Sequence, residues 1–281
     1  MPATSPGIDF ERRGDGAPLL LLHGTGGSRS VWRPVVDGLA DRRELLLVDL
    51  PGHGRSAPPP SGVPHSPLGY APLLARLLDE LDLASAHVAG NSVGGWTALE
   101  LAKLGRARSV VAFGPAGLWP KRSPWSSIAQ LWAQHQLGRL TAPAVPPVMR
   151  SPVGRTLFLG GTVAKPRRVP PEDAIELATT FARTPAFTEH LNATRRERFR
   201  DGQEIRVPVT VAWSERERLI PRKGRGRDEL PAHTRWIHLP GCGHIPMWDD
   251  PDLVARTILE GTEEVGGAGL EPGTSSLSER R

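Results

Sequence analysis

Short, almost wholly apolar runs alternate with amphipathic segments along the first part of the chain. The runs Pro18–Leu22, Leu45–Asp49 and Ser109–Gly114 have the continuous apolar character of strands buried on both faces of a sheet. Between them, Trp32–Leu39 and Leu68–Leu83 carry apolar residues at helical spacing. Alternating strands and helices require crossover connections, so the pattern predicts an α/β protein with a mainly parallel sheet flanked by helices.

This alternation stops at Pro115 and resumes only after residue 204. No strand pattern occurs between them, and prolines separate several helical stretches, of which the clearest are Trp125–Gly138, Pro171–Arg183 and Thr184–Phe199. Such a segment is too long for a loop inside a compact domain, so we interpret it as an inserted helical cap. Three further strands are predicted: an early one within Phe10–Gly16, followed by a Gly-Asp-Gly turn, and two late ones at Val207–Trp213 and Arg235–Leu239. A closing helix is predicted at Pro251–Leu259. The predicted organisation is thus a core of residues 1–114 and 205–261, a cap of residues 115–204 and a disordered tail of residues 262–281, whose composition is rich in Gly, Ser, Glu and Arg.

A serine between glycines lies where a predicted strand meets a predicted helix. The strand-forming run His87-Val88-Ala89 leads directly into Gly90-Asn91-Ser92-Val93-Gly94, and a helical pattern follows. Gly-x-Ser-x-Gly in this setting is typical of a tight turn that exposes the serine hydroxyl. The Val93 N–H would then point from the helix N-terminus toward an oxyanion formed beside Ser92.

Polar residues also follow other predicted strands of the parallel sheet, whose carboxyl ends gather functional groups at one edge. They are His23-Gly24-Thr25, the run Ser214-Glu215-Arg216-Glu217-Arg218, and His244 in a glycine-containing loop after the last strand. A serine hydroxyl is a weak nucleophile near neutral pH and needs a nearby base such as histidine, which a carboxylate can orient. The chain order of serine, acid and histidine fits this fold.

Taken together, these motifs resemble the α/β-hydrolase fold family, in its capped serine-hydrolase and esterase branch. The residues that carry the resemblance are His23-Gly24, Asp49-Leu50-Pro51-Gly52-His53-Gly54-Arg55-Ser56, Gly90-Asn91-Ser92-Val93-Gly94-Gly95 and Gly241-Cys242-Gly243-His244. The similar region extends from about Pro18 to Leu259, and its cap is the least specific part.

The resemblance implies a role for each matching position. Ser92 would be the nucleophile, His244 the general base and then the general acid, and the backbone N–H groups of Thr25 and Val93 the oxyanion hole. The acid departs from the pattern, because Glu217 stands where the branch usually has aspartate. Glu215 is the alternative acid, and a merely solvated charged turn is the third possibility. We expect His23 and His53 to be structural hydrogen-bonding residues and Cys242 to be a small loop residue.

The net charge of +5 raises the question of nucleic acid as a partner. The basic clusters at residues 195–198 and 222–227 are interrupted by acids or glycines and have no interleaved aromatic residues, so we predict solvated surface and no nucleic-acid partner. No apolar run approaches the length needed to span a bilayer, which leads us to expect no membrane partner. A single cysteine fits a reducing compartment, so we expect a cytoplasmic protein. No metal-ligand spacing or cofactor fingerprint is visible, and we expect neither group.

The resemblance implies hydrolysis of a small, apolar carboxylic ester or related acyl compound through an acyl-serine intermediate. The aromatic residues of the predicted cap, Trp119, Trp125, Trp132, Phe158, Phe181 and Phe187, are expected mainly to pack the cap, with some of them lining the pocket. The same triad also serves C–C bond hydrolases, thioesterases, acyltransferases and perhydrolases. A low-turnover ligand-binding or signalling protein is the alternative of another class. The sequence leaves the substrate and the oligomeric state open.

Overall fold

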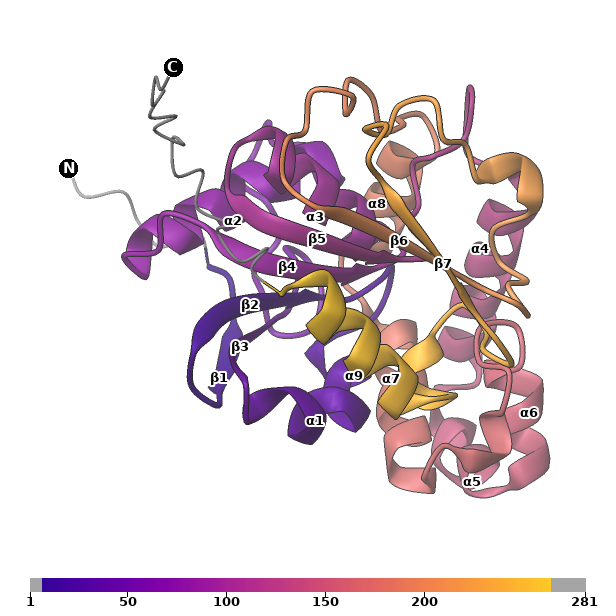
Figure 1. Cartoon of the computed structure of the whole chain (residues 1–281). Helices are drawn as coiled ribbons and strands as arrows, with labels where there is room; N and C mark the ends of the chain where they lie inside the picture. Colours follow the sequence, from indigo (N-terminus) through magenta and orange to yellow (C-terminus); the bar gives the residue numbers. More distant parts are fainter. Residues whose placement is uncertain (1–6, 264–281) are drawn as a thin grey trace, which may run out of the picture.

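The computed structural model describes residues 7–263, and within them seven strands form one sheet in the order β1-β3-β2-β4-β5-β6-β7 (Figure 1). The strands are β1 Phe10–Arg13, β2 Ala17–Leu22, β3 Arg43–Val48, β4 Ala86–Asn91, β5 Ala107–Phe113, β6 Val209–Ser214 and β7 Arg235–Leu239. Strand β1 is antiparallel to β3, and every other pairing is parallel. The predicted α/β-hydrolase architecture, a mainly parallel sheet flanked by helices, is therefore confirmed.

The helices are α1 Val36–Ala40, α2 Pro67–Glu80, α3 Val93–Lys103, α4 Trp125–Leu140, α5 Val145–Arg150, α6 Pro152–Leu159, α7 Pro171–Arg183, α8 Phe187–Thr194 and α9 Pro251–Gly261. Helices α2 and α3 cover one face of the sheet, while α1 and α9 cover the other (Figure 1). Helices α4 to α8 all lie between β5 and β6 in the chain. No helix among residues 7–263 is long and apolar enough to cross a membrane.

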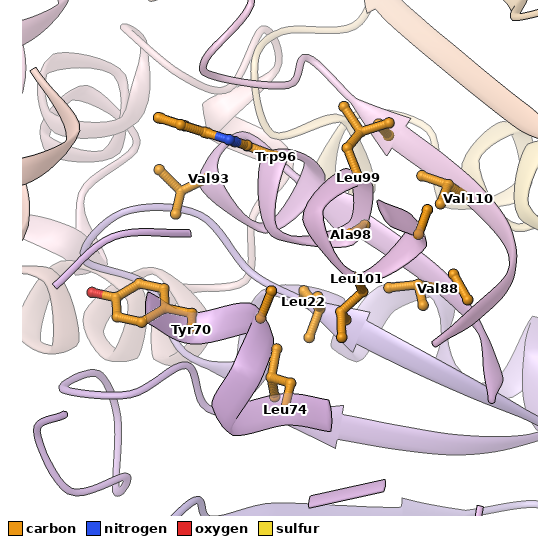
Figure 2. Packing of buried hydrophobic residues seen from close by; sticks show 14 of the residues in the cluster. Leu22, Tyr70, Leu74, Val88, Val93, Trp96, Ala98, Leu99, Leu101 and Val110 are labelled. Atoms are coloured by element: carbon orange, nitrogen blue, oxygen red, sulfur yellow. The ribbon is translucent and has the colours of Figure 1, made fainter. Parts of the chain in front are cut away.

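Successive side chains of a strand point to opposite faces of the sheet, and both faces of the central strands are covered, which explains why β2 is almost wholly apolar. In β2, Leu20 and Leu22 join the core beneath α2 and α3, while Leu19 and Leu21 join the core beneath α1 and α9. Figure 2 shows the first of these cores, where the side chains of Leu22 and Val88 lie among those of the α2 and α3 helices. The sheet is thus packed on both faces, and this packing positions the loops at its strand ends.

The chain changes direction across the sheet at β2. From β2 it passes to β3 on one side, and then returns to place β4 on the other side of β2. In open parallel sheets, ligands bind at the carboxyl ends of the strands where the order reverses in this way. The loops after β2 and β4 contain His23-Gly24-Thr25 and Ser92, so the topology brings these two sequence motifs together.

Proline accounts for most of the differences from the predicted elements. The helix predicted at Trp32–Leu39 is a 3₁₀ segment over Arg29–Val35, which contains Pro34, followed by the short α1. Pro34 has no N–H to donate, which interrupts the α-helical pattern. The helix predicted at Thr184–Phe199 was too long, since α8 covers only Phe187–Thr194. Residues 264–281, most of the predicted disordered tail, lie outside the described residues.

Candidate active site

Ser92 lies at the tight turn between β4 and α3, with a positive φ of 57° and a ψ of −117°. A non-glycine residue held in such a conformation costs roughly 1–3 kcal/mol, and such strain concentrates at functional sites. The flanking glycines are needed because the backbone packs closely there. A Cβ on Gly90 would collide with the Gly94 carbonyl oxygen, and a Cβ on Gly94 would collide with the Leu22 carbonyl oxygen. The Gly-x-Ser-x-Gly spacing is therefore a packing requirement of this turn.

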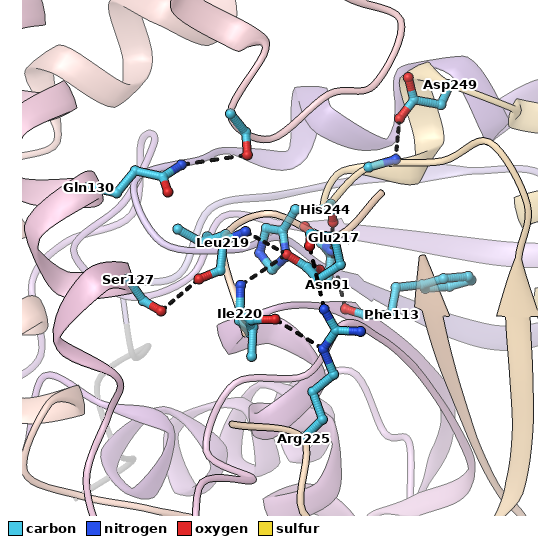
Figure 3. Close-up of polar contacts among 12 residues, drawn as sticks. Asn91, Phe113, Ser127, Gln130, Glu217, Leu219, Ile220, Arg225, His244 and Asp249 are labelled. Carbon is cyan, nitrogen blue, oxygen red and sulfur yellow. Dashed lines mark hydrogen bonds and ion pairs between the residues drawn. The ribbon is translucent and has the colours of Figure 1, made fainter. Parts of the chain in front are cut away.

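His244 and Glu217 form a buried pair at the ends of the last two strands. The His244 Nδ1 and the Glu217 Oε2 are 2.7 Å apart, and their side chains are 3% and 0% exposed (Figure 3). The other carboxylate oxygen of Glu217 accepts hydrogen bonds from the Leu219 and Ile220 N–H groups, at 2.8 Å and 3.0 Å. Since the carboxylate accepts and Nδ1 donates, the opposite nitrogen of His244, Nε2, is left as the acceptor.

The environment of Glu217 keeps its carboxylate ionised. Burial alone would raise the pKa of Glu217, but the adjoining His244 imidazole and the two backbone donors outweigh it and hold that pKa below its ordinary value. Arg225 steadies the same loop through its guanidinium, which donates to the Ile220 carbonyl at 3.0 Å and lies 4.9 Å from the Trp213 ring centroid. Part of the basic cluster at residues 222–227 thus supports the loop that carries Glu217.

Asn91, the residue before Ser92, ties the histidine loop to the sheet. Its side-chain Nδ2 donates to the His244 carbonyl at 2.8 Å and to the Phe113 carbonyl at 3.2 Å (Figure 3). This amide is buried and joins β4, β5 and the loop after β7. Sequence reasoning gave Asn91 no structural task, because its partners are distant in the chain.

Ser92, His244 and Thr25 line one cavity, with a volume of about 70 Å³. Its walls are mostly apolar and include Phe158 of α6 and Phe181 of α7. The His244 Nε2 has no hydrogen-bond partner among the described residues. A larger groove of about 880 Å³ lies elsewhere, lined by charged residues and containing neither Ser92 nor His244. The smaller cavity is the one that holds the candidate chemistry, so we take it as the site.

The Thr25 side chain is hydrogen-bonded to the inserted helices. Its hydroxyl lies 3.0 Å from Nε2 of His190 on α8. The opposite nitrogen of His190 lies 3.0 Å from the His65 carbonyl and 2.9 Å from the Tyr70 hydroxyl. A carbonyl only accepts, so Nδ1 carries the proton and Nε2 accepts from the Thr25 hydroxyl. The loop after β2 is thereby connected to α8 through a buried polar chain that the sequence did not reveal.

The sequence model of the alpha/beta hydrolase family matches residues 19–257. The chain belongs to the alpha/beta hydrolase family. The predicted family is confirmed, and the relatives below support a hydrolase.

One relative of this hydrolase is the epoxide hydrolase EphH of Mycobacterium tuberculosis, which is 33% identical over 195 residues, or 67% of this chain and 91% of that protein. Among solved structures, carboxylesterase CesB from Bacillus subtilis has a TM-score of 0.68 at 19% identity, covering 90% of this chain and 87% of that one. The meta-cleavage product hydrolase CumD from Pseudomonas fluorescens IP01 has a TM-score of 0.69 at 18% identity, covering 90% and 93%. At these identities the two structures show a common fold.

The other candidate residues of the hydrolase lie in distinct surroundings. Glu215 is exposed and accepts from the Gly241 N–H at 2.7 Å, away from the His244 ring. His23 and His53 are buried. The His23 ring is hydrogen-bonded to the Gly24 carbonyl and accepts from the Leu50 N–H in the loop after β3, while the His53 ring is hydrogen-bonded to the Pro51 carbonyl. Val93 occupies the first position of α3. The buried Cys242 is unpaired and has no catalytic partner among the described residues.

The aromatic residues expected to pack the cap divide into three groups. Phe158 and Phe181 line the cavity, while Trp119 and Phe187 are buried in packing contacts, with Phe187 stacked on His135 at 3.8 Å. The expectation was wrong for Trp125 and Trp132, which are 76% and 54% exposed. The apolar character of these two tryptophans gave no indication that α4 turns them toward solvent.

Gly114 is a position where one methyl group should reduce activity in the hydrolase. A Cβ there would lie 3.1 Å from the Glu217 Oε2 and 3.4 Å from the His244 Nδ1, so Gly114→Ala should displace the pair by a few tenths of an ångström. Small misplacements of catalytic groups are costly. With the catalytic roles proposed below for Glu217 and His244, we expect kcat/KM on a nitrophenyl ester to fall about tenfold to a hundredfold.

Gly105→Ala is the matched control for this substitution. Gly105 has a φ of 70°, against 49° for Gly114, but a Cβ there would meet no atom within 4 Å. Both variants should lose about 1–2 kcal/mol of unfolding free energy from the left-handed backbone. Only Gly114→Ala should lose activity. Equal kinetics for the two variants would contradict a catalytic role for the pair of Glu217 and His244.

Buried neutral histidines predict that the hydrolase is sensitive to acid. Burial lowers the pKa of His23 to about 4 and that of His53 to about 3, and it holds the pKa of His190 well below its ordinary value. In the unfolded chain these side chains titrate near 6.5, so below that pH the unfolded state binds protons that the folded state does not. The stabilisation from these neutral histidines is fully present above about pH 6.5. Below that pH the unfolding free energy should fall by up to about 1.4 kcal/mol per pH unit for each histidine as the pH drops toward 4.

Urea unfolding at about pH 7, 6 and 5 measures this slope. His53→Gln should reduce this slope by about the share of one histidine, because it removes one side chain that is neutral in the folded state and protonated in the unfolded state. An unfolding free energy that stays constant from about pH 7 to pH 5 would rule out the predicted effect of the buried histidines.

Proposed function

We propose that this hydrolase cleaves small, apolar carboxylic esters through an acyl-serine intermediate, with Ser92, His244 and Glu217 as its triad. The observation that carries the proposal is the buried 2.7 Å contact between the Glu217 carboxylate and the His244 Nδ1, beside a cavity that Ser92 also lines. This contact fixes one nitrogen of the imidazole as a donor, and the other nitrogen is then available to accept the Ser92 proton.

In the proposed reaction, the Ser92 Oγ attacks the ester carbonyl carbon while its proton passes to the His244 Nε2. The ionised Glu217 stabilises the imidazolium that results. The tetrahedral intermediate collapses, and His244 gives the proton to the departing alkoxide. Water then attacks the acyl-serine with His244 again as the base, which releases the carboxylic acid and restores Ser92.

The oxyanion of each tetrahedral intermediate would be held by the backbone N–H groups of Thr25 and Val93. Val93 is at the first position of α3, where a backbone N–H has no intrahelical acceptor and the helix dipole favours negative charge. The hydrogen bond between the Thr25 hydroxyl and His190 supports this role, because it restrains the loop that supplies the second donor. Each such donor typically contributes about 3–4 kcal/mol to transition-state stabilisation.

The identity of the nucleophile favours esters over epoxides, although EphH is a relative. Serine opening an epoxide would leave an alkyl ether, which water cannot readily hydrolyse, so the enzyme would not turn over. Epoxide hydrolases of this fold family have an aspartate at the position of Ser92, and their intermediate is a hydrolysable ester. An acyl substrate is therefore the one that a serine at residue 92 can release.

The cavity suggests a short acyl group. Its volume of about 70 Å³ lies well below the roughly 300–1,000 Å³ of pockets for drug-sized ligands. Its apolar walls favour an alkyl chain over a charged one.

We further propose that α4 to α8 form a cap over the strand ends. We also propose that the protein is cytoplasmic, which its single cysteine supports.

A panel of nitrophenyl esters from acetate to octanoate tests the proposal. We expect a burst of nitrophenol from acylation, and the highest kcat/KM for the shortest chains. Phe158→Ala should enlarge the cavity and move the preference toward longer chains, while the exposed Ser126→Ala on α4 should not. No turnover of any ester by the folded protein would overturn the proposal, and a preference for long chains in the wild type would overturn its substrate class.

A further inference from the structure

The outer face of α4 and α6 is unusually apolar for a surface exposed to water. Its side chains project from two helices, with exposed fractions of 76% for Trp125, 54% for Trp132, 56% for Leu137 and 82% for Leu140 on α4, and 58% for Val153 and 81% for Leu157 on α6. We call these six residues the α4–α6 outer face. Large exposed apolar side chains gathered on neighbouring helices are typical of a site that contacts a partner or a membrane.

The two helices that carry this face are held together. The Gln134 side-chain amide of α4 donates to the Phe158 carbonyl of α6 at 3.0 Å. Figure 1 places α4 and α6 on the same side of the molecule, away from α2. Their inner sides contribute Leu131 and Phe158 to the wall of the Ser92 cavity. Whatever contacts the outer face therefore lies one helix thickness from the site.

The segment of the chain that contains α4 and α6 carries only positive charges. Between Glu100 and Glu172 the chain has no acidic residue and eleven lysines and arginines. Three of these, Lys121, Arg122 and Arg139, are exposed and form no ion pair with any residue between 7 and 263. Trp125, Trp132 and Arg139 are spaced seven residues apart, so at about 3.6 residues per turn they lie nearly in line along α4.

We propose that the α4–α6 outer face docks on the surface of an anionic phospholipid bilayer. Tryptophan is enriched at membrane–water interfaces, leucine and valine enter the boundary of the acyl chains, and exposed arginine and lysine bind anionic headgroups. The apolar residues of the face and Arg139 lie on two adjacent helices, and Lys121 and Arg122 stand just before α4. Neither helix contains an acidic residue that would repel the lipid. A negatively charged bilayer matches both the apolar and the basic components.

This surface arrangement needs no membrane-spanning segment. The sequence expectation of no membrane partner rested on the lack of such a segment, and docking by an exposed helix face is a different mode of binding. The proposal is also independent of the proposed ester hydrolysis, because docking requires neither Ser92 nor substrate. Ser92→Ala should bind vesicles as well as the wild type, which separates a failure of one proposal from a failure of the other.

Co-sedimentation of the full chain with vesicles tests the docking. We expect binding to vesicles of phosphatidylcholine mixed with phosphatidylglycerol, little binding to phosphatidylcholine alone, and weaker binding as salt is raised. Trp132→Ser combined with Leu157→Ser should reduce the affinity about tenfold or more. Arg139→Gln should reduce it about fivefold. Leu104→Ser, at a leucine that is 49% exposed outside the outer face, is the matched control and should have no effect.

Three outcomes would overturn the proposal. The first is the absence of binding to anionic vesicles at low salt. The second is binding that the Trp132 and Leu157 substitutions do not weaken, with circular dichroism showing folded variants. The third is a wild-type dimer by analytical ultracentrifugation that these two substitutions convert to a monomer, because the outer face would then be covered by a second copy of the chain.

Discussion

Replacing Ser92 with alanine is expected to lower kcat for ester hydrolysis by roughly a millionfold, the largest effect of any single substitution in this hydrolase. In the proposed triad the three residues act as a unit, so loss of the proposed nucleophile should remove covalent catalysis altogether. A residual rate above that in water should remain, because the proposed oxyanion donors of Thr25 and Val93 and the cavity stay in place. Steady-state kinetics on nitrophenyl acetate, with the nitrophenol burst, measure both quantities.

The alanine variant should fold normally and gain some stability. Ser92 has a φ of 57°, and alanine in that turn carries the same backbone strain without a buried hydroxyl. The exposed Ser126→Ala serves as the control for removal of a serine hydroxyl elsewhere. A Ser92→Ala protein that retained a burst would show that another residue forms the acyl intermediate.

Glu217→Gln should lower kcat by about ten-thousandfold, the second largest effect. Glutamine nearly matches the shape of glutamate, but it has no charge to stabilise the His244 imidazolium, and its amide can favour the wrong tautomer. The pKa of Glu217 is held below its ordinary value, so the wild-type carboxylate remains charged through the neutral range and the loss should persist across it. A pH–rate profile of the two proteins measures this difference.

Glu215→Gln is the matched control, two residues away in the same loop. Glu215 accepts from the Gly241 N–H and has no contact with the His244 ring among the described residues, so its substitution should change kcat less than about threefold. The opposite pattern, with activity lost in Glu215→Gln and kept in Glu217→Gln, would transfer the acid's role to Glu215.

Much of the fold could be predicted because buried parallel strands have a distinctive sequence. The apolar runs at residues 18–22, 45–49 and 109–114 lie in or overlap β2, β3 and β5, and the helix predicted at Pro171–Arg183 matches α7. Helices α5 and α6 were missed, since their sequences contain Pro146, Pro147 and Pro152 in the first turns. Proline is tolerated at the first turn of a helix, but it conceals the apolar periodicity in so short a segment.

The candidate site could be predicted only where its chemistry follows a local motif. Ser92 and His244 stand in glycine-containing loops after strands, and the chain order suggested an acid between them. Gly114, Asn91 and His190 act through partners 22 or more residues away, such as the His244 carbonyl for Asn91 and the Thr25 hydroxyl for His190. Contacts over such distances depend on strand register and helix packing, which a single sequence does not specify.

The exposure of the two tryptophans of α4 also could not be predicted from the sequence, because it depends on helix packing. Trp125 and Trp132 have the residue type expected for packing, and only the orientation of α4 against α7 turns them to solvent. The close approach of Gly138 to Ala182 fixes that orientation, because a Cβ on Gly138 would lie 3.0 Å from the Ala182 Cβ. The surface that we propose to bind lipid therefore follows from helix packing.

Labelling with an alkyl fluorophosphonate tests the central claim most directly, because this reagent phosphonylates an activated serine. We predict that the folded wild-type protein gains one phosphonyl group, that peptide mass spectrometry locates it on Ser92, and that His244→Ala labels at least a hundredfold more slowly. Ser92→Ala should remain unmodified under the same conditions. A folded wild-type protein that is not labelled, or that is labelled at another residue, would contradict the assignment of Ser92 as the nucleophile.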